Sequence, residues 1–431
     1  MSHLAYIAKI DKIQEIEGAN TIQIGYILGT KVIISKEIKE GYIGVFFPSE
    51  LQLSEKFCEE NNLFRHSTLN KDCNKKGFFE DNRRVRCQPF MKIKSDGFFI
   101  EIESLSYTGT DLSKFKLGDS FAELDGNKIC EKYISEKTRN AITKNRIKKP
   151  KSIEAPSFLP HIDTDQFKYY VDSIPKESLI SISSKQHGTS FRCGHVKTVR
   201  NLSKFKKFVN KFIPIFNVEK WEYVNGTRRV VLFEENFDKV GFHGSEQFRF
   251  DVLEKIKPHL IKNLIIYGEI YGWANNCTIM PNHDVTKLKD KGYEKKYGKD
   301  VVYKYGCREG EFDFMIYRIA LCNEDGFITD FTPPQIEHWC TVRGFKYPKN
   351  IVNTFIYDGN TEKLRDLVEE LTERPDKLTE DYIDPSHISE GVVVRCDHGT
   401  NIPMFYKNKS YAFKVLEGIA KENEIDIEDA N

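Results

Sequence analysis

The stretch LISISSKQHGTS, from Leu179 to Ser190, places a lysine directly after an alternating apolar run. In LISISS the apolar and hydroxyl residues alternate with the period of two that predicts a half-buried strand. Lys185 then opens a short turn that contains Gly188. Lysine is a weak nucleophile near neutral pH because its ordinary pKa is about 10.4, unless burial or a neighbouring cation favours the neutral amine. The stretch predicts a strand that presents a nucleophilic lysine, with a surface lysine in a turn as the alternative.

The composition is that of a large globular protein. A chain of 431 residues is too long for one ordinary hydrophobic core, which predicts two domains. The 65 basic residues are balanced by 64 acidic ones, so a globally basic nucleic-acid binder is excluded while local basic surfaces remain possible. Ten cysteines without a CxxC pair indicate scattered reduced thiols, and neither a disulfide framework nor a zinc site.

No segment has the pattern of a targeting or membrane signal. The N-terminal MSHLAYIAKIDKIQ lacks the apolar core of a signal peptide, and no later segment is apolar enough to cross a bilayer. We therefore expect an intracellular, soluble protein, with the cytoplasm as its location and no membrane partner. The oligomeric state is left open.

Short β-type runs separated by turn signals fill the N-terminal region. Between Ala5 and Phe47 the runs AYIAKI, TIQIGYIL, KVIISKEI and YIGVFFP are separated by EGAN, GT and KEG. Strand character resumes in RRVRCQPFMKIKSDGFFIEI, Arg83 to Ile102, where basic and aromatic side chains interleave. We expect an OB-like β-barrel that binds nucleic acid. A β-domain with a solvated basic face is the alternative.

A basic stretch marks the expected domain boundary. From Lys137 to Lys151 the chain is KTRNAITKNRIKKPK, without an acidic residue and with little apolar periodicity. We expect residues 1–150 to form the nucleic-acid-binding domain with this basic linker. Residues 151–431 would then form a second domain that contains the lysine turn.

Two acidic residues stand in apolar, strand-like runs downstream of the lysine. LIIYGEIYG, Leu264 to Gly272, places Glu269 between two glycines, and ISEGVVVR, Ile388 to Arg395, contains Glu390 at the start of its apolar part. A carboxylate is seldom placed in so apolar a run without a partner. A structural ion pair for Glu269 and a solvent-exposed strand start for Glu390 are the alternatives when each is considered singly.

Two further strands follow the pattern of the earlier ones. FDFMIYRIA, Phe312 to Ala320, combines apolar and aromatic residues. MFYKNKSYAFKVLEG, Met404 to Gly418, places Lys407, Lys409 and Lys414 in what we expect to be a strand-like context. Considered alone, neither run identifies a chemistry.

The order of these motifs resembles that of the covalent nucleotidyltransferases, and in particular of the ATP-dependent RNA ligases. A KxxG lysine, an arginine, an acidic residue between glycines, an aromatic strand, EGVVV and FKV follow one another between Lys185 and Lys414. The resemblance implies an α+β fold, in which an adenylyltransferase domain of antiparallel sheets flanked by helices follows the OB-like barrel.

Three features point to the small group of RNA ligases with an N-terminal OB domain. KQHGTS has His187 where DNA ligases and messenger-RNA capping enzymes carry aspartate, and Ser190 where they carry arginine. We expect no C-terminal OB domain after Lys414, because the β-rich region lies at the N-terminus instead. Members of that group seal nicks in duplexes that have a 3′-OH RNA strand. The resemblance therefore implies a nicked, RNA-containing duplex as the partner.

The resemblance also implies catalytic roles. Lys185 would attack the α-phosphorus of ATP, expel pyrophosphate and carry a lysyl-AMP intermediate. Glu390 would hold the water shell of a catalytic Mg²⁺, or of Mn²⁺ in its place. Lys414, with Lys409 or Lys407, would bind the α-phosphate in the transition state. We expect Lys414 to be the principal lysine because AFKVL fits this group better.

Other residues are implied to bind the nucleotide. Glu269 would accept hydrogen bonds from the ribose, and Gly188 would permit close approach of the backbone. Arg200 would contact the nucleotide or the terminal phosphate, with a surface salt bridge as its alternative.

Two aromatic residues are candidates for the contact with adenine. Either Tyr317 or Phe314 would stack on the base, because the phenylalanine and aspartate usual in this strand are replaced by Tyr317 and Arg318. His187 would border the nucleotide, and a packed turn residue is its alternative.

The expected function is three-step joining of RNA 3′-OH and 5′-phosphate ends through lysyl-AMP and AMP-capped polynucleotide. Two other classes remain open. A capping-type guanylyltransferase shares the lysine chemistry but transfers GMP, so labelling with ATP or GTP separates it. A non-enzymatic nucleic-acid-binding protein with a degenerate nucleotidyltransferase domain would show no labelling at all.

Overall fold

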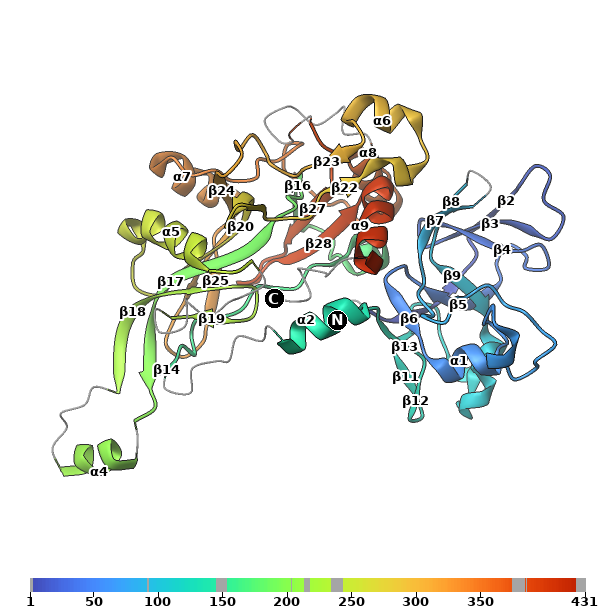
Figure 1. Cartoon of the computed structure of the whole chain (residues 1–431), viewed down its shortest axis with the longest axis horizontal. Coiled ribbons are helices and arrows are strands. Elements are labelled where there is room, and N and C mark those ends of the chain that lie inside the picture. The colour runs from blue at the N-terminus through green and yellow to red at the C-terminus, as the bar shows by residue number, and fades with distance from the viewer. Residues whose placement is uncertain are drawn as a thin grey trace. The chain divides into compact units, whose positions relative to one another are not determined.

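The computed structural model (Figure 1) describes residues 3–90, 93–144, 153–202, 204–212, 218–233, 243–373, 384 and 386–423. The chain divides into two compact units. Unit 1 comprises Met1–Ile134, Asp165–Asp172 and Glu417–Ile419, and unit 2 comprises Ser135–Thr164, Ser173–Leu416 and Ala420–Asn431. The boundary expected at residue 150 falls within 145–152, outside the described residues, and stays a prediction.

Unit 1 is built from short strands. A four-stranded sheet has the order β10-β1-β5-β9, a three-stranded sheet has the order β2-β3-β4, and β6–β13, β7–β8 and β11–β12 form separate pairs. The bounds are β1 Ala5–Lys9, β2 Lys12–Glu15, β3 Ile22–Ile27, β4 Thr30–Ser35, β5 Ile43–Phe47, β6 Leu51–Leu53, α1 Glu55–Glu60, β7 Cys87–Phe90, β8 Ile93–Asp96, β9 Phe98–Glu101, β10 Ser120–Phe121, β11 Glu123–Leu124, β12 Asn127–Lys128, β13 Cys130–Lys132, β15 Asp165–Gln166 and α3 Phe167–Tyr170.

The four-stranded sheet of unit 1 is buried on both faces. Alternate side chains of β1 and β5 enter two different cores, with Ile7, Val45 and Phe47 in one and Tyr6 and Phe46 in the other. In the part of unit 1 that the structure describes, the strands fall into separate sheets and no closed barrel is found. The expected OB-like barrel is therefore not confirmed.

Unit 2 contains two antiparallel sheets. The large sheet has the order β19-β18-β17-β20-β24-β25, with β14 on β17 and β21 on β20, while β26, β16, β27 and β28 are neighbours in the small sheet. The bounds are β14 Ile153–Glu154, β16 Leu179–Ser184, β17 Thr189–Arg200, β18 Glu219–Gly226, β19 Val231–Leu232, β20 Leu264–Ala274, β21 Cys277–Thr278, β22 His283–Asp284, β23 Asp300–Val301, β24 Phe312–Cys322, β25 Ile328–Asp330, β26 Phe355–Ile356, β27 Gly391–Asp397 and β28 Met404–Lys409. The expected fold of antiparallel sheets with helices is confirmed at this level.

Helices accompany these sheets (Figure 1). Their bounds are α2 Glu136–Lys144, α4 Lys204–Phe212, α5 Gln247–Ile256, α6 Lys291–Tyr297, α7 Pro333–Arg343, α8 Thr361–Glu373 and α9 Tyr411–Asn423. None of the helices in the described ranges is both long and apolar enough to cross a bilayer.

Strand β20 packs against a hydrophobic core on each face, which explains why its sequence is apolar without alternation. Ile266 packs with Val252 of α5 and Trp339 of α7, whereas the neighbouring Ile265 faces the opposite core with Phe158. Because both faces are covered, nine of the eleven positions of the strand are buried, and Glu269 and Trp273 are half-buried. A polar side chain in such a strand needs a partner or an opening to solvent.

Candidate active site

Lys185 is placed by the pairing of β16 with β27. The antiparallel ladder of these strands continues into a hydrogen bond from Lys185 N to Gly391 O at 2.8 Å. Gly391 has a φ of +136°, and a Cβ at this position would lie 2.0 Å from the carbonyl oxygen of Asn408. Only glycine fits there. The preceding residue, Glu390, is thereby held beside the lysine.

Two lysines and a histidine surround this carboxylate, and we call the four residues the lysine–glutamate cluster. Lys185 Nζ lies 2.8 Å from Glu390 Oε1, and Lys409 Nζ lies 3.6 Å from the same oxygen. His187 Nδ1 lies 3.6 Å from Glu390 Oε2. The Glu390 side chain is fully buried, whereas that of Lys185 remains 18% exposed. The candidate nucleophile is therefore the most accessible member of the cluster.

The cluster carries an excess of positive charge. Burial alone would raise the pKa of Glu390, but the charge of Lys185, the contact with His187 and the charge of Lys409 outweigh it and lower the pKa to about 2. The carboxylate is thus ionised at neutral pH. Its ion pairs are not aligned as hydrogen bonds, and both oxygens lack a well-oriented donor among the described residues. Glu390 therefore keeps acceptor capacity for a further ligand.

His187 packs behind the carboxylate. Its ring lies edge-on to Tyr303 at 4.7 Å and to Phe413 at 4.9 Å between ring centres, and its backbone N–H donates to Tyr305 OH at 2.8 Å. The side chain is only 4% exposed. These contacts match the alternative of a packed turn residue, and a role toward the nucleotide stays a prediction.

Gly188 brings the lysine turn close to Glu269. Strands β17 and β20 pair Ser190 with Glu269. A Cβ on Gly188 would lie 2.4 Å from Ile270 O and 2.8 Å from Glu269 Cγ, so a larger residue would push the turn away. The glycine therefore allows a close approach of the turn to β20, while the predicted approach of its backbone to the nucleotide stays a prediction.

A cleft of about 590 Å³ lies between the two sheets of unit 2. This volume is in the range of small-molecule sites. The lining includes Lys185 and Glu269 together with residues of both sheets and of the loops around them: His161, Ile162, Thr164, Ser181, Ser183, Ser184, Gln186, Ser190, Arg228, Tyr317, Arg318, Pro333, Pro334, Ile336, Glu337, Tyr347, Pro348, Lys349, Asn350, Val352, Asn353, Thr354, Val393, Arg395 and Phe405.

Of the two candidate rings, Tyr317 lines the cleft. The register of β20 and β24 shifts between Tyr267 and Gly268, which leaves Tyr317 as the extra residue of a bulge. Bulges redirect side chains in this way. Phe314 is instead 4% exposed in the hydrophobic core, with its ring 5.5 Å from that of Phe191. The structure thus places Tyr317, and not Phe314, where a ligand can meet it.

Tyr317 is held by a histidine that the sequence motifs did not single out. His161 Nδ1 and Tyr317 OH are in hydrogen-bond contact. Burial, together with the charges of Arg192 and other arginines, lowers the pKa of His161 well below its ordinary value. Burial and the charge of Glu269 raise the pKa of Tyr317. Both rings are therefore neutral at physiological pH.

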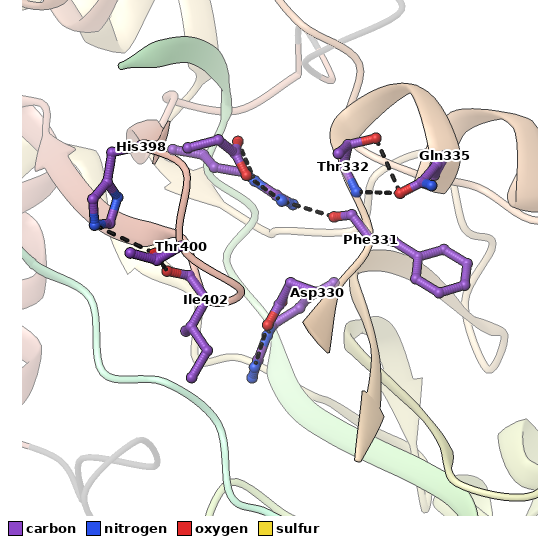
Figure 2. A network of polar contacts seen from close by, with 10 residues as sticks. Asp330, Phe331, Thr332, Gln335, His398, Thr400 and Ile402 are labelled. Atoms are coloured by element: carbon purple, nitrogen blue, oxygen red, sulfur yellow. Dashed lines mark hydrogen bonds and ion pairs between the residues drawn. The ribbon is translucent and has the colours of Figure 1, made fainter. Parts of the chain in front are cut away.

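Two buried arginines fix the segment that leads into α7, of which Figure 2 labels Asp330, Phe331 and Thr332. Arg318 of β24 binds both carboxylate oxygens of Asp330, and Arg395 of β27 donates to Phe331 O at 2.7 Å. The large and small sheets are thereby joined through one short segment. Helix α7 begins two residues later, and its first prolines line the cleft.

The lysines of β28 face the site. Side chains of a strand alternate, so Phe405, Lys407 and Lys409 point to one face. Phe405 lines the cleft at one end of this row, and Lys409 reaches Glu390 at the other. Lys407 and Lys409, the two lysines separated by one residue, therefore lie on the face of β28 that is turned toward the candidate site.

The strand-like context expected for Lys414 is wrong. Lys414 lies in α9, and its backbone N–H donates to Ser410 O at 3.0 Å. Ser410 Oγ also accepts from Phe413 N, as a helix cap does. The serine ends the strand and starts the helix, and Lys414 is not among the residues that line the cleft.

Arg200 lies at the other end of β17. At about 3.3 Å per residue, its ten-residue separation from Ser190 corresponds to roughly 33 Å. Its Nη2 is 3.0 Å from Glu222 Oε1, and its side chain is 39% exposed. The structure thus shows the surface salt bridge that was its alternative, and the predicted contact with nucleotide has no support from its position.

Cleft residues that the motifs missed include His161, Arg228, Arg395 and Phe405. Arg228 Nη2 forms an ion pair with Asp163 Oδ1 at 2.7 Å, and this pair is in contact with solvent. Phe405 and Arg395 had a usable signal, since they stand at even spacing from Lys409 and Gly391 on their strands. His161 and Arg228 come from loops, where no periodicity exists to reveal them.

A second buried charged group, which we call the Arg249–Glu246 pair, supports the turn from the other side. Both side chains are fully buried and in direct contact. Arg249 also donates to Ser190 O at 3.2 Å and to Thr189 Oγ1 at 2.6 Å. The pair fixes the first residues of β17, directly after the lysine turn.

Solved structures share this fold. Naegleria gruberi RNA ligase in a lysine-to-methionine variant with AMP and Mn has a TM-score of 0.58 and 14% sequence identity, with 95% of this chain and 97% of that chain covered. An arginine-to-alanine variant of the same ligase with ATP and Mn has a TM-score of 0.58 and 17% identity, with 97% of this chain and 100% of that chain covered. At this identity the likeness establishes the fold.

The sequence itself establishes the family. The profile of the family described as RNA ligase matches residues 179–416, which is more than half of the chain. The chain belongs to the RNA ligase family, as the order of its motifs predicted. No curated protein matches the chain by sequence.

Proposed function

We propose that this protein is an ATP-dependent RNA ligase that joins RNA 3′-OH and 5′-phosphate ends, most effectively at nicks in duplexes. The observation that carries the proposal is the lysine–glutamate cluster at the wall of a nucleotide-sized cleft. The Naegleria ligase with the same fold was solved with ATP and Mn, which supports the choice of nucleotide and a divalent metal.

In the first step Lys185, paired as a cation with Glu390, loses a proton to solvent, and its neutral amine attacks the α-phosphorus of ATP. A second proton leaves the nitrogen after the attack. An N–P bond forms, the bond from the α-phosphorus to the bridging oxygen breaks, and pyrophosphate leaves. Lys409, buried beside Glu390, stabilises the charge that develops on the α-phosphate. Lys407, on the same face of β28, is the second cation for the phosphates.

The residues around Glu390 fit a divalent cation. The carboxylate is ionised, and both of its oxygens keep acceptor capacity. Mg²⁺ usually binds one or two carboxylates and keeps several waters, so a single glutamate suffices. When bound, Mg²⁺ or Mn²⁺ supplies charge neutralisation at the phosphates.

The adenosine occupies the part of the cleft near Glu269 and Tyr317. Glu269 accepts hydrogen bonds from the ribose hydroxyls. Tyr317, fixed by the bulge and by His161, stacks on the base, a contact worth on the order of 1–3 kcal/mol. Phe405, on the opposite strand system, provides a second apolar wall.

The two later steps require RNA. AMP passes from Lys185 to a 5′-phosphate, and the 3′-OH then attacks that phosphate and expels AMP. We propose that the N-terminal region, residues 1–150, has an OB-like role in holding the duplex, while residues 151–431 carry the chemistry. Deletion of residues 1–150 should weaken nick sealing more than self-adenylylation.

The test is labelling with ATP or GTP that carries a labelled α-phosphate. We expect covalent labelling by ATP in the wild type, none in Lys185→Ala, and normal labelling in the control Lys346→Ala, whose side chain pairs with Asp313 on the surface. Labelling by GTP alone, or no labelling of the wild type with Mg²⁺ or Mn²⁺, would overturn the proposal. Ligation of nicked duplexes with each strand varied between RNA and DNA then defines the substrate.

A further inference from the structure

Helix α4 exposes an unusual amount of aromatic surface. The exposed fractions of Phe205, Phe208 and Phe212 are 74%, 63% and 69%. Among the described residues only two other phenylalanines, Phe78 and Phe327, are exposed large hydrophobic residues. Figure 1 shows α4 beyond the ends of β17 and β18. This apolar surface is not part of any core cluster of the described chain.

The three rings form one stripe on the helix. At about 100° per residue, positions 205, 208 and 212 fall within an arc of about 60°. The rings of Phe208 and Phe212 pack together with centres 5.2 Å apart. The nine residues KFKKFVNKF contain four lysines and no acidic residue, and the lysine positions lie outside the aromatic arc.

The surrounding sequence has the same charge. From Lys197 to Val218 there are six Lys and Arg residues and no Asp or Glu, in a chain whose overall net charge is only +1. The partner of this helix must therefore be anionic and must also offer an apolar layer. Charge complementarity alone would suit a nucleic acid, but the aromatic stripe has to be explained as well.

A nucleic acid fits the stripe less well than a lipid surface does. Duplex RNA is recognised mainly through its shape, its 2′-hydroxyls and its phosphates, which leaves no use for three clustered phenylalanines. Single strands stack bases on separate ring faces, whereas Phe208 and Phe212 pack against each other at an interplanar angle of 65°. A short helix with a lysine-rich face and an aromatic face is the pattern of segments that lie in the membrane interface.

We propose that α4 is a peripheral membrane-binding element that takes an anionic phospholipid surface. The phenylalanines enter the boundary between headgroups and acyl chains, and the lysines remain among the anionic headgroups. Binding of this kind lies on the membrane and does not span it, and it departs from the expectation of no membrane partner that was drawn from the sequence. It is independent of the proposed ligase chemistry, because α4 is not part of the cleft.

Vesicle flotation with the full-length chain tests the proposal. Phosphatidylcholine vesicles are compared with vesicles containing 30% phosphatidylserine, a composition chosen as the probe. We expect binding to the serine-containing vesicles only, with at least a tenfold loss for the triple variant Phe205→Ser, Phe208→Ser and Phe212→Ser. Binding should also weaken steeply with added salt. Phe327→Ser, which changes an isolated phenylalanine that is 74% exposed, is the matched control and should bind as the wild type does.

Covalent AMP labelling and RNA affinity are measured on the same samples. Normal labelling of the triple variant with lost vesicle binding supports the proposal and shows that unit 2 is folded. Absence of wild-type binding to the anionic vesicles overturns it. So does vesicle binding that survives the triple substitution, or a triple variant that loses RNA affinity while vesicle binding is unchanged. Failure of ATP labelling in the wild type would contradict the proposed function and leave the membrane result to stand by itself.

Discussion

Unit 2 contains several buried charged groups, and two of them differ in their charge balance. The Arg249–Glu246 pair sets one cation against one anion, and the guanidinium is also satisfied by Ser190 O and Thr189 Oγ1. The lysine–glutamate cluster sets two lysines against Glu390, whose oxygens retain acceptor capacity. The first group is balanced in charge, although Glu246 Oε1 has no hydrogen-bond donor among the described residues. The second is complementary to an anionic, metal-binding ligand, which is why we assign chemistry to it and structural support to the pair.

The sharpest test of this difference is the same substitution in both groups. Glu390→Gln should lower AMP transfer by about 10²–10³, because it removes the carboxylate that organises the charge around the reacting phosphate. Single-turnover labelling with ATP measures the effect. Glu246→Gln should leave labelling of the folded protein within an order of magnitude. The assignment of chemistry to the lysine–glutamate cluster is wrong if Glu246→Gln loses AMP labelling and Glu390→Gln does not.

Glu246→Gln should instead lower stability. Breaking a buried pair leaves Arg249 with an uncompensated charge, which costs about 3–5 kcal/mol. The melting temperature of unit 2 is expected to fall by about 10 °C in a thermal scan. Glu254→Gln on the same helix is the control, because its pair with Lys257 is solvent-exposed and contributes about 1 kcal/mol or less. Equal effects of the two variants would show that the buried pair is not special.

The contributions of Lys409 in the lysine–glutamate cluster and of Lys414 in α9 can be measured separately. Lys409→Met should lower adenylylation by about 30–100-fold, because Lys409 lies 3.6 Å from Glu390 on the cleft side of β28. Lys414→Met should have a smaller effect, because Lys414 lies in α9 and not on the strand that carries Lys407 and Lys409. Rates of lysyl-AMP formation at saturating ATP provide the comparison. The reverse order would restore the assignment that the sequence motif suggested.

Acid should affect the neighbourhood of the cluster through His387. Burial lowers the pKa of His387 to about 4 from 6.5, so the unfolded chain takes up the proton first. Stability that is present above pH 6.5 is then lost as the pH falls toward 4. Between pH 7.5 and 5 the contribution of His387 to the unfolding free energy should drop by roughly 2 kcal/mol. Burial also lowers the pKa of His161 and His243, which add to the total drop, so the drop should be smaller in His387→Gln by the His387 contribution. Glu390 adds no slope in this interval, since its contribution is lost only between pH 4.5 and about 2.

Urea denaturation at the two pH values measures that drop. The expectation fails if the wild type and His387→Gln have the same pH dependence.

The smallest effect is expected at Arg200. Arg200→Ala removes a partly exposed pair with Glu222, which is worth about 1 kcal/mol or less. Lysyl-AMP formation should stay within about twofold of the wild type. A loss of tenfold or more would place Arg200 at the nucleotide despite its position at the end of β17, and Lys197→Ala serves as the neighbouring control.

The family, the antiparallel strands and the candidate nucleophile could be predicted because each depends on local pattern. LISISS alternates as β16 does, and the order of KQHGTS, the GE pair and EGVVV along the chain identified the family before any contact was known. The N-terminal strands were also predicted, but their closure into a barrel depends on long-range pairing and is not confirmed.

Side-chain choice within the site could not be predicted in the same way. Tyr317 and Phe314 stand three positions apart, so alternation places them on opposite faces of β24, but only tertiary packing decided which face borders the cleft. Lys409 lies in β28 and Lys414 lies in α9, because Ser410 follows the last residue of the strand and caps the helix. The apolar spacing of this stretch is compatible with a strand or with a helix, so the sequence did not show the change.

The sequence by itself therefore determined the class of chemistry around KQHGTS, because a lysine, two carboxylates and a glycine turn in a fixed order carry that information locally. Tertiary structure decided which cations, rings and loops surround Lys185. Strand register, the bulge in β24 and the close approach at Gly391 bring together residues that are hundreds of positions apart, and distances of that kind are set by packing and not by spacing along the chain.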